Sequence, residues 1–96
     1  MASAKRSLLV KHEVRIRAFE VAQWYDKQAP DSRTALDFFE ELDAHLALIE
    51  ERPEGFPVRS GTIRRVPFKV FPYALDYRLT ETQILVVQLV AMAQET

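Results

Sequence analysis

Cysteine is absent from all 96 residues of the sequence. This absence excludes disulfides, thiolate metal ligands and cysteine nucleophiles. It also fits a reducing compartment, so we expect the protein to be cytoplasmic. Glycine is nearly as scarce, because only Gly55 and Gly61 occur. A phosphate-cradling loop needs several glycines at fixed spacing, and nucleotide hydrolysis is therefore excluded in practice.

Long apolar segments are also lacking. The longest, residues 84–92, is interrupted by Gln88 and falls far short of the roughly 20 residues that span a bilayer. Near the N-terminus only residues 8–10 are apolar, whereas a signal peptide needs about 7–15 such residues. We therefore expect no membrane association. Hydrophobic residues still make up 48% of the chain, which predicts one folded domain over residues 1–96.

Histidine occurs only twice, as His12 and His45. A metal site usually needs three or four ligands, and neither histidine has a diagnostic spacing to carboxylates. We expect no metal and no cofactor, and we place both histidines at the surface or its boundary. The acidic run of Glu40, Glu41 and Asp43 could do acid–base chemistry, but a solvated helix face is the expected interpretation.

An excess of positive charge is missing, since the net charge is −1. Residues 1–30 carry six Lys or Arg and three Asp or Glu, a sum of +3, whereas residues 31–58 carry two and eight, a sum of −6. Residues 59–96 carry five and three, a sum of +2. A dedicated nucleic-acid binder is usually basic overall, so strong affinity for ribosomes or DNA is not expected. The basic C-terminal part can still meet an anionic partner locally.

Helical spacing dominates the first half of the chain. Residues 13–28 are expected to form a helix that ends at Ala29-Pro30, because proline pushes the preceding residue out of the α region. Asp31 or Ser32 can cap a second helix that runs to about residue 51. The apolar stripes of the two helices comprise Ala18, Val21, Ala22 and Tyr25, then Ala35, Phe38, Phe39, Leu42, Leu46 and Ile49. Together they predict a helical hairpin.

A spacing of two predicts strands over residues 62–70, 73–79 and 84–92, after a short first strand over residues 7–11. Pro67 cannot donate to a neighbouring strand, which places the strand that contains it at a sheet edge. The last strand is apolar on both faces and is expected to be central, although the sequence leaves its register open. The predicted fold class is α+β: a helical hairpin packed on one face of a small, mostly antiparallel sheet, in the order (β)ααβββ.

A turn at Phe71-Pro72 gives the two strands that flank it a register. On the face away from the helices it pairs Arg65 with Arg78, Pro67 with Asp76 and Lys69 with Ala74. On the helix-facing side it pairs Val66 with Tyr77, Phe68 with Leu75 and Val70 with Tyr73.

The basic residues on and beside this hairpin are the candidate site for a partner or target. Arg65 and Arg78 would repel each other if they were directly opposite. A phosphate or a partner's carboxylate between them would relieve the repulsion, and arginine binds either group well. The alternative is a solvated face with Asp76 as internal counter-ion. The candidate residues are Arg64, Arg65, Lys69 and Arg78.

Three aromatic residues could also belong to the site or pack in the core. Tyr73 and Tyr77 alternate onto the helix-facing side, which favours core packing over a role at a site. Tyr73 nevertheless stays a candidate for partner binding. Trp24 lies beside the apolar stripe of the first helix, and it fits the edge of the core and an interface anchor equally well.

Several phrases, in their order along the chain, resemble the RelE/ParE toxin superfamily. They are Trp24-Tyr25, then residues 39–43, 52–57 and 61–65, and above all residues 71–78, Phe-Pro-Tyr-Ala-Leu-Asp-Tyr-Arg. The resemblance covers nearly the whole chain. It implies the toxin of a bacterial type II toxin–antitoxin system, a plasmid stabilisation protein that is neutralised by a cognate antitoxin. It also implies a homodimer or a heterotetramer with that antitoxin.

Proteins of this kind divide by activity. ParE-like members poison DNA gyrase by binding, whereas RelE-like members are metal-independent endoribonucleases that cleave mRNA in the ribosome. In a RelE-like enzyme the resemblance would place Arg65, Lys69 and Arg78 on the phosphate. Many relatives end the last strand with His and Arg, but residues 90–96 contain neither here. We therefore expect a ParE-like toxin without enzymatic activity; a RelE-like nuclease and a non-toxic binding module are the alternatives.

Overall fold

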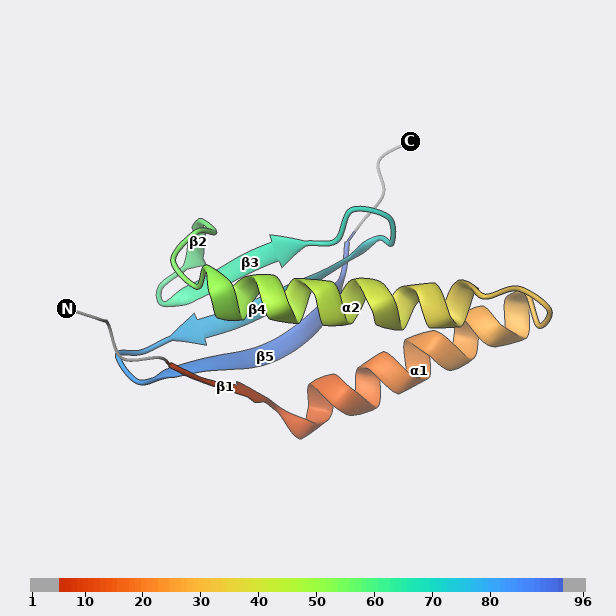
Figure 1. Cartoon of the computed structure of the whole chain (residues 1–96), viewed down its shortest axis with the longest axis horizontal. Coiled ribbons are helices and arrows are strands. Elements are labelled where there is room, and N and C mark those ends of the chain that lie inside the picture. Colours follow the sequence, from red (N-terminus) through yellow and green to blue (C-terminus); the bar gives the residue numbers. More distant parts are fainter. Residues whose placement is uncertain (1–5, 93–96) are drawn as a thin grey trace.

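The computed structural model describes residues 6–92, which form seven elements in the order βααββββ (Figure 1). The helices are α1 (His12–Gln28) and α2 (Thr34–Glu51). The strands are β1 (Ser7–Val10), β2 (Val58–Ser60), β3 (Ile63–Pro67), β4 (Tyr73–Leu79) and β5 (Gln83–Ala91). The predicted order is confirmed with one addition, because the short strand β2 was not expected.

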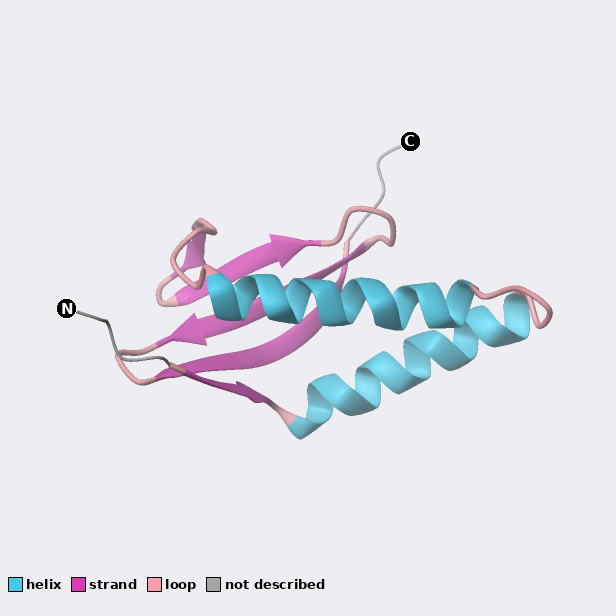
Figure 2. Cartoon of the chain, viewed as in Figure 1, coloured by secondary structure: helices cyan, strands magenta, loops and turns pink. Residues whose placement is uncertain are grey.

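The five strands form one sheet in the order β1-β5-β4-β3-β2, and both helices lie on one face of it (Figure 2). β1 runs parallel to β5, and the other neighbours are antiparallel. The predicted α+β class and the central position of the last strand are thus confirmed. Neither helix of the described residues is long and apolar enough to cross a bilayer.

Both helices bury one stripe. α1 buries Val14, Ala18, Val21 and Ala22, and α2 buries Phe38, Leu42, His45 and Ile49. The spacing of three and four residues in each set is that of a helix face. The predicted cap of α2 is wrong, because the N-cap residue is Arg33 and no side chain caps it. The Ser32 hydroxyl accepts the Thr34 N–H at 3.2 Å instead, just outside the helix.

The register of β3 and β4 differs from the prediction by two residues. Val66 lies opposite Leu75, and Arg65 lies opposite Asp76. A shift of two keeps every side chain on its predicted face, because side chains alternate with a period of two. The physical reason is a wider turn: β3 ends at Pro67, and residues 68–72 form the loop.

Val70, predicted to lie in the core, is in this loop and is 79% exposed. Pro67 was placed on an edge strand, but β3 has neighbours on both sides. The pairing with β2 involves only Ile63 and Arg64 of β3, however. Within the described residues, the Pro67 end of β3 therefore lacks a neighbour on that side, and this accommodates its missing N–H.

Phe38 of α2 stands at the centre of the core, where it is 0% exposed. Its ring lies 5.4 Å from that of Phe71 and 5.6 Å from that of Tyr73, both edge to face. Tyr77 is equally buried, and its hydroxyl donates to the carbonyl oxygen of Pro53 at 2.6 Å. Burial raises the pKa of Tyr77, and the nearby Arg64 lowers it by less. Both tyrosines thus pack in or against the core, as the sequence favours.

We predict that Phe38→Ala lowers the free energy of unfolding by about 3–5 kcal/mol, since it leaves a cavity among packed rings. Urea unfolding followed by circular dichroism measures this loss. Leu36→Ala is the control, because Leu36 is on the same helix but half exposed. Its effect should stay within about 1 kcal/mol. Equal losses in the two variants would contradict a core centred on Phe38.

Candidate functional site

The four basic candidates lie on different surfaces. Arg64 is on the helix-facing side of β3, opposite the buried Tyr77, and its Nη1 donates to the Phe56 carbonyl oxygen at 2.5 Å. Arg65 and Arg78 are on the other face, but they are not opposite each other. Lys69 is exposed in the loop that follows β3, and its backbone N–H donates to the Glu41 carboxylate. The single basic platform that the predicted register implied is therefore not formed.

Arg65 is engaged by Asp76. Its Nε and Nη2 donate to the two carboxylate oxygens at 2.6 and 3.0 Å, and Nη1 lies 3.9 Å from the Met92 sulfur. The carboxylate of Asp76 is almost fully buried, although it is on the face without helices. The hydrogen bonds to this carboxylate raise the pKa of Arg65, and burial opposes the rise. Asp76 is thus the internal counter-ion of Arg65, as in the alternative to a partner-binding site that the sequence left open.

The acidic run of α2 was expected to lie wholly in water, and this is wrong for Glu41. Its carboxylate accepts the backbone N–H of Lys69 at 2.5 Å and those of Val70 and Phe71 at 3.2 Å. The side chain is only 11% exposed. The signal in the sequence is the helical spacing, because Glu41 comes three residues after Phe38 and so lies beside the buried stripe. The other acidic residues of the run are exposed, as expected.

His45 is buried, which corrects its expected place at the surface. Its ring stacks on Phe68 with centroids 4.8 Å apart, and Nδ1 is 2.8 Å from the Glu41 carbonyl oxygen. An open hollow of about 510 Å³ lies beside it, between α2 and the loop that contains Lys69. His12 is exposed, as expected. Among residues 6–92, no three His, Asp or Glu side chains gather as a metal site requires.

Two candidates from different elements meet. Trp24 of α1 and Tyr73 of β4 line one hollow of about 280 Å³, together with Arg17 and Glu20. Trp24 is 55% exposed and packs edge to face on Tyr25, with centroids 5.1 Å apart. This geometry combines a core-edge contact with a free indole surface. Tyr73 is partly buried and contributes to the lining of the hollow.

The sequence did not reveal a groove between the helices. α1 and α2 meet at their connection and diverge toward β1 (Figure 1), and a hollow of about 250 Å³ lies between them. Its apolar lining includes Val14 and Ala18 of α1 and Leu42 and Leu46 of α2. Phe19 stands at its rim, 66% exposed, with its ring edge to face on Phe39. An exposed aromatic ring beside an apolar hollow is typical of a protein-binding surface.

Comparisons with known proteins give a structural match. No family model matches the sequence, and no curated protein matches it. One similar solved structure is described as the chromosomal ParDE TA system from P. aeruginosa. The two chains superpose with a TM-score of 0.81 at 12% sequence identity, over 93% of this chain and 98% of the other. The fold is shared. The likeness confirms that the fold is one found in a chain of a ParDE system, in agreement with the resemblance in the sequence.

We predict that Arg65→Ala destabilises the fold by about 3 kcal/mol, because it leaves the Asp76 carboxylate buried without its partner. Thermal or urea unfolding measures the loss. Arg78→Ala is the matched control in the neighbouring strand, since Arg78 is exposed. Its effect should stay within about 0.5 kcal/mol. A solvated, unpaired Arg65 would make the two variants alike.

We also predict that Glu41→Ala costs about 1–3 kcal/mol, because three backbone N–H groups lose their acceptor. Amide hydrogen exchange should become faster at Lys69, Val70 and Phe71, where the loop opens. Glu40→Ala is the control, since within residues 6–92 Glu40 pairs only with Arg33, at the surface. Unchanged exchange at the three amides in Glu41→Ala would refute the role of this carboxylate.

Proposed function

We propose that this chain is the toxin, or a toxin-like member, of a type II toxin–antitoxin system. In this proposal it acts as a ParE-like protein, by binding a cellular target, and a cognate antitoxin neutralises it. The observation that carries the proposal is the apolar groove between α1 and α2, in a fold shared with a chain of a ParDE system. A fold can serve many functions, so the groove and its residues have to carry the argument.

The groove suits a helix of the antitoxin. Helix-in-groove recognition places apolar side chains of a ligand into a hydrophobic trough between two helices. Phe19 at the rim and Ile16 one turn before it are exposed on α1, where such a helix would cover them. β2 pairs with β3 only at Ile63 and Arg64, so among residues 6–92 the Pro67 end of β3 has no neighbouring strand on that side. An extended segment of the antitoxin could pair there.

The target is proposed to meet the remaining candidates. Trp24 and Tyr73 share a hollow, and Arg78 and Lys69 are exposed cations. DNA gyrase and the ribosome with its mRNA are the two targets that the resemblance offers. Arg64 and Arg65 would contribute only the N–H groups that are not already bonded within the chain. Oligomerisation as a homodimer, or as a heterotetramer with the antitoxin, belongs to the same proposal.

Binding is favoured over RNA cleavage by the state of the proposed catalytic groups. Arg65 directs two donors at Asp76, so it would have to leave a buried carboxylate before it could hold a phosphate. His45 is 6% exposed, stacks on Phe68, and has its Nδ1 2.8 Å from the Glu41 carbonyl oxygen. Proton transfer in catalysis needs a group within hydrogen-bond reach of the reacting atoms.

Expression of the chain from a tightly repressed promoter tests the proposal. We expect growth arrest on induction, and recovery when the product of the adjacent reading frame is co-expressed. DNA damage signalling and gyrase-dependent supercoiling should change, whereas mRNA in purified ribosomes should stay intact. Phe19→Ser at the groove rim should leave the arrest in place but weaken rescue by about tenfold in antitoxin dose, since an exposed anchor is lost.

Other outcomes point to the alternatives. Ribosome-dependent mRNA cleavage that Lys69→Ala abolishes would favour the RelE-like endoribonuclease. Lys69 suits this test because its ammonium is exposed and Lys69→Ala keeps the backbone N–H that Glu41 accepts. Normal growth with the folded chain present at high level would favour the non-toxic binding module.

A further inference from the structure

The α2 side of the groove is strongly acidic. α2 contains six Asp or Glu residues and no Lys or Arg between its first and last residue. Four of the six are engaged: Asp37 and Glu40 each pair with Arg33 at 3.0 Å, Glu51 lies 3.8 Å from Arg52, and Glu41 binds the loop amides. A ligand lying along α2 therefore meets the carboxylates that remain.

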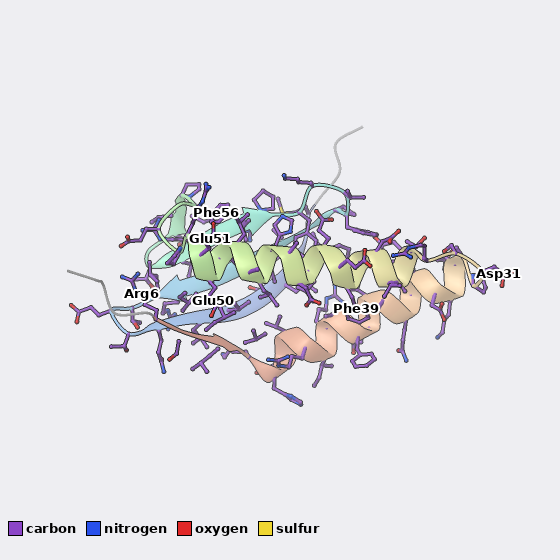
Figure 3. All side chains as sticks on the ribbon, in the orientation of Figure 1. Arg6, Asp31, Phe39, Glu50, Glu51 and Phe56 are labelled. Atoms are coloured by element: carbon purple, nitrogen blue, oxygen red, sulfur yellow. The ribbon has the colours of Figure 1, made fainter. Side chains whose placement is uncertain are left out.

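The two remaining carboxylates are Asp43, which lines the groove, and Glu50, which lies beyond the groove's lining on α2. Asp43 is on the wall opposite Arg15 of α1. Glu50 follows two helical turns later and so lies on the same side of α2. Figure 3 shows Phe39 between α2 and α1, Glu50 on the same lower side of α2 further along the helix, and Glu51 on its upper side. No ion pair of Asp43, Glu50 or Arg15 occurs within the described part of the chain.

The two walls thus differ in charge while the trough between them is apolar. An amphipathic helix placed there brings its two polar edges against these walls. An anionic edge against Asp43 and Glu50 would be repelled in a partly desolvated contact, and like charges across an interface strongly disfavour a partner. A cationic edge would be attracted there, and a carboxylate would be attracted to Arg15.

We propose that the occupant of this groove is an antitoxin helix with Lys or Arg along the edge that follows α2 and a carboxylate toward Arg15. The inference rests on the proposed function, and it names the chemistry of the partner at that site. The sequence analysis instead expected a carboxylate of the partner to bind the arginines of the sheet. Here the partner's cations, directed at Asp43 and Glu50, decide which helix is accepted.

A pair of synthetic helical peptides tests the charge preference. Both carry leucines at the spacing of one helix face, and their polar positions are lysine in one and glutamate in the other. Fluorescence anisotropy with the full chain measures the dissociation constants at low and at physiological salt. We expect the lysine peptide to bind about tenfold tighter or more, with a gap that narrows as salt screens the charges.

Single charge reversals locate the contact. Glu50→Lys and Asp43→Lys should each weaken the lysine peptide by about threefold to tenfold, because attraction becomes repulsion. Glu51→Lys is the control for net charge: it makes the same change of charge at the next residue of α2, which pairs with Arg52 and does not line the groove. Its effect should stay within about twofold, because only the distant, screened field changes. Phe19→Ala should weaken both peptides, since it removes an apolar anchor.

Three results would overturn the inference. Tighter binding of the glutamate peptide would mean that the groove prefers an anionic helix. Equal losses of lysine-peptide affinity in Glu50→Lys and Glu51→Lys would mean diffuse attraction to an acidic protein. Binding of neither peptide would show that the groove takes no helix. The growth test reports separately: arrest with antitoxin rescue but no charge preference would leave the proposed function standing alone. A non-toxic chain with the expected peptide preference would keep the inference and remove the toxin.

Discussion

The carboxylate of Glu41 fixes the part of the fold from which the candidate sites follow. It joins α2 to a loop 28–30 residues further along the chain through three backbone N–H groups. A carboxylate satisfies several donors at once, and such charge-assisted bonds are stronger than neutral ones. With residues 68–72 held as a wide loop, Phe71 turns into the core and β3 ends at Pro67. The register of β3 and β4 is then shifted by two residues from that of a tight turn at Phe71-Pro72.

This register decides the chemistry of the open sheet face. Arg65 meets Asp76 rather than Arg78, so a repulsive pair becomes an ion pair with a nearly buried carboxylate. Because the Arg65 guanidinium is paired with Asp76 of the neighbouring strand, it joins the two strands and has fewer N–H groups left for a ligand. In the part of the chain that the structure describes, the face therefore presents Arg78 as an exposed cation in place of a cluster. The surfaces built by α1 and α2, where exposed aromatic rings border hollows, are therefore the proposed places of recognition.

Sequence reasoning found what depends on local spacing and missed what depends on distant contacts. Both helices, β4 and β5 follow from apolar residues at periods of 3.6 and two. β2 was missed because its three residues are all exposed and show no alternation. The hairpin register was missed because the loop is shaped by Glu41, and no local pattern predicts that contact. The groove depends on how far α1 and α2 diverge, which side-chain spacing along one helix does not specify.

One helix therefore has two roles that its acidic sequence hides. Glu41 points to the loop, and its carboxylate stabilises the fold by accepting backbone N–H groups. Asp43 and Glu50 lie on another side of the helix and form no ion pair within the described residues. In the proposed complex, a cationic edge of the partner supplies the missing counter-ions. Selectivity for a partner in that complex comes from two of the six acidic residues of α2, Asp43 and Glu50.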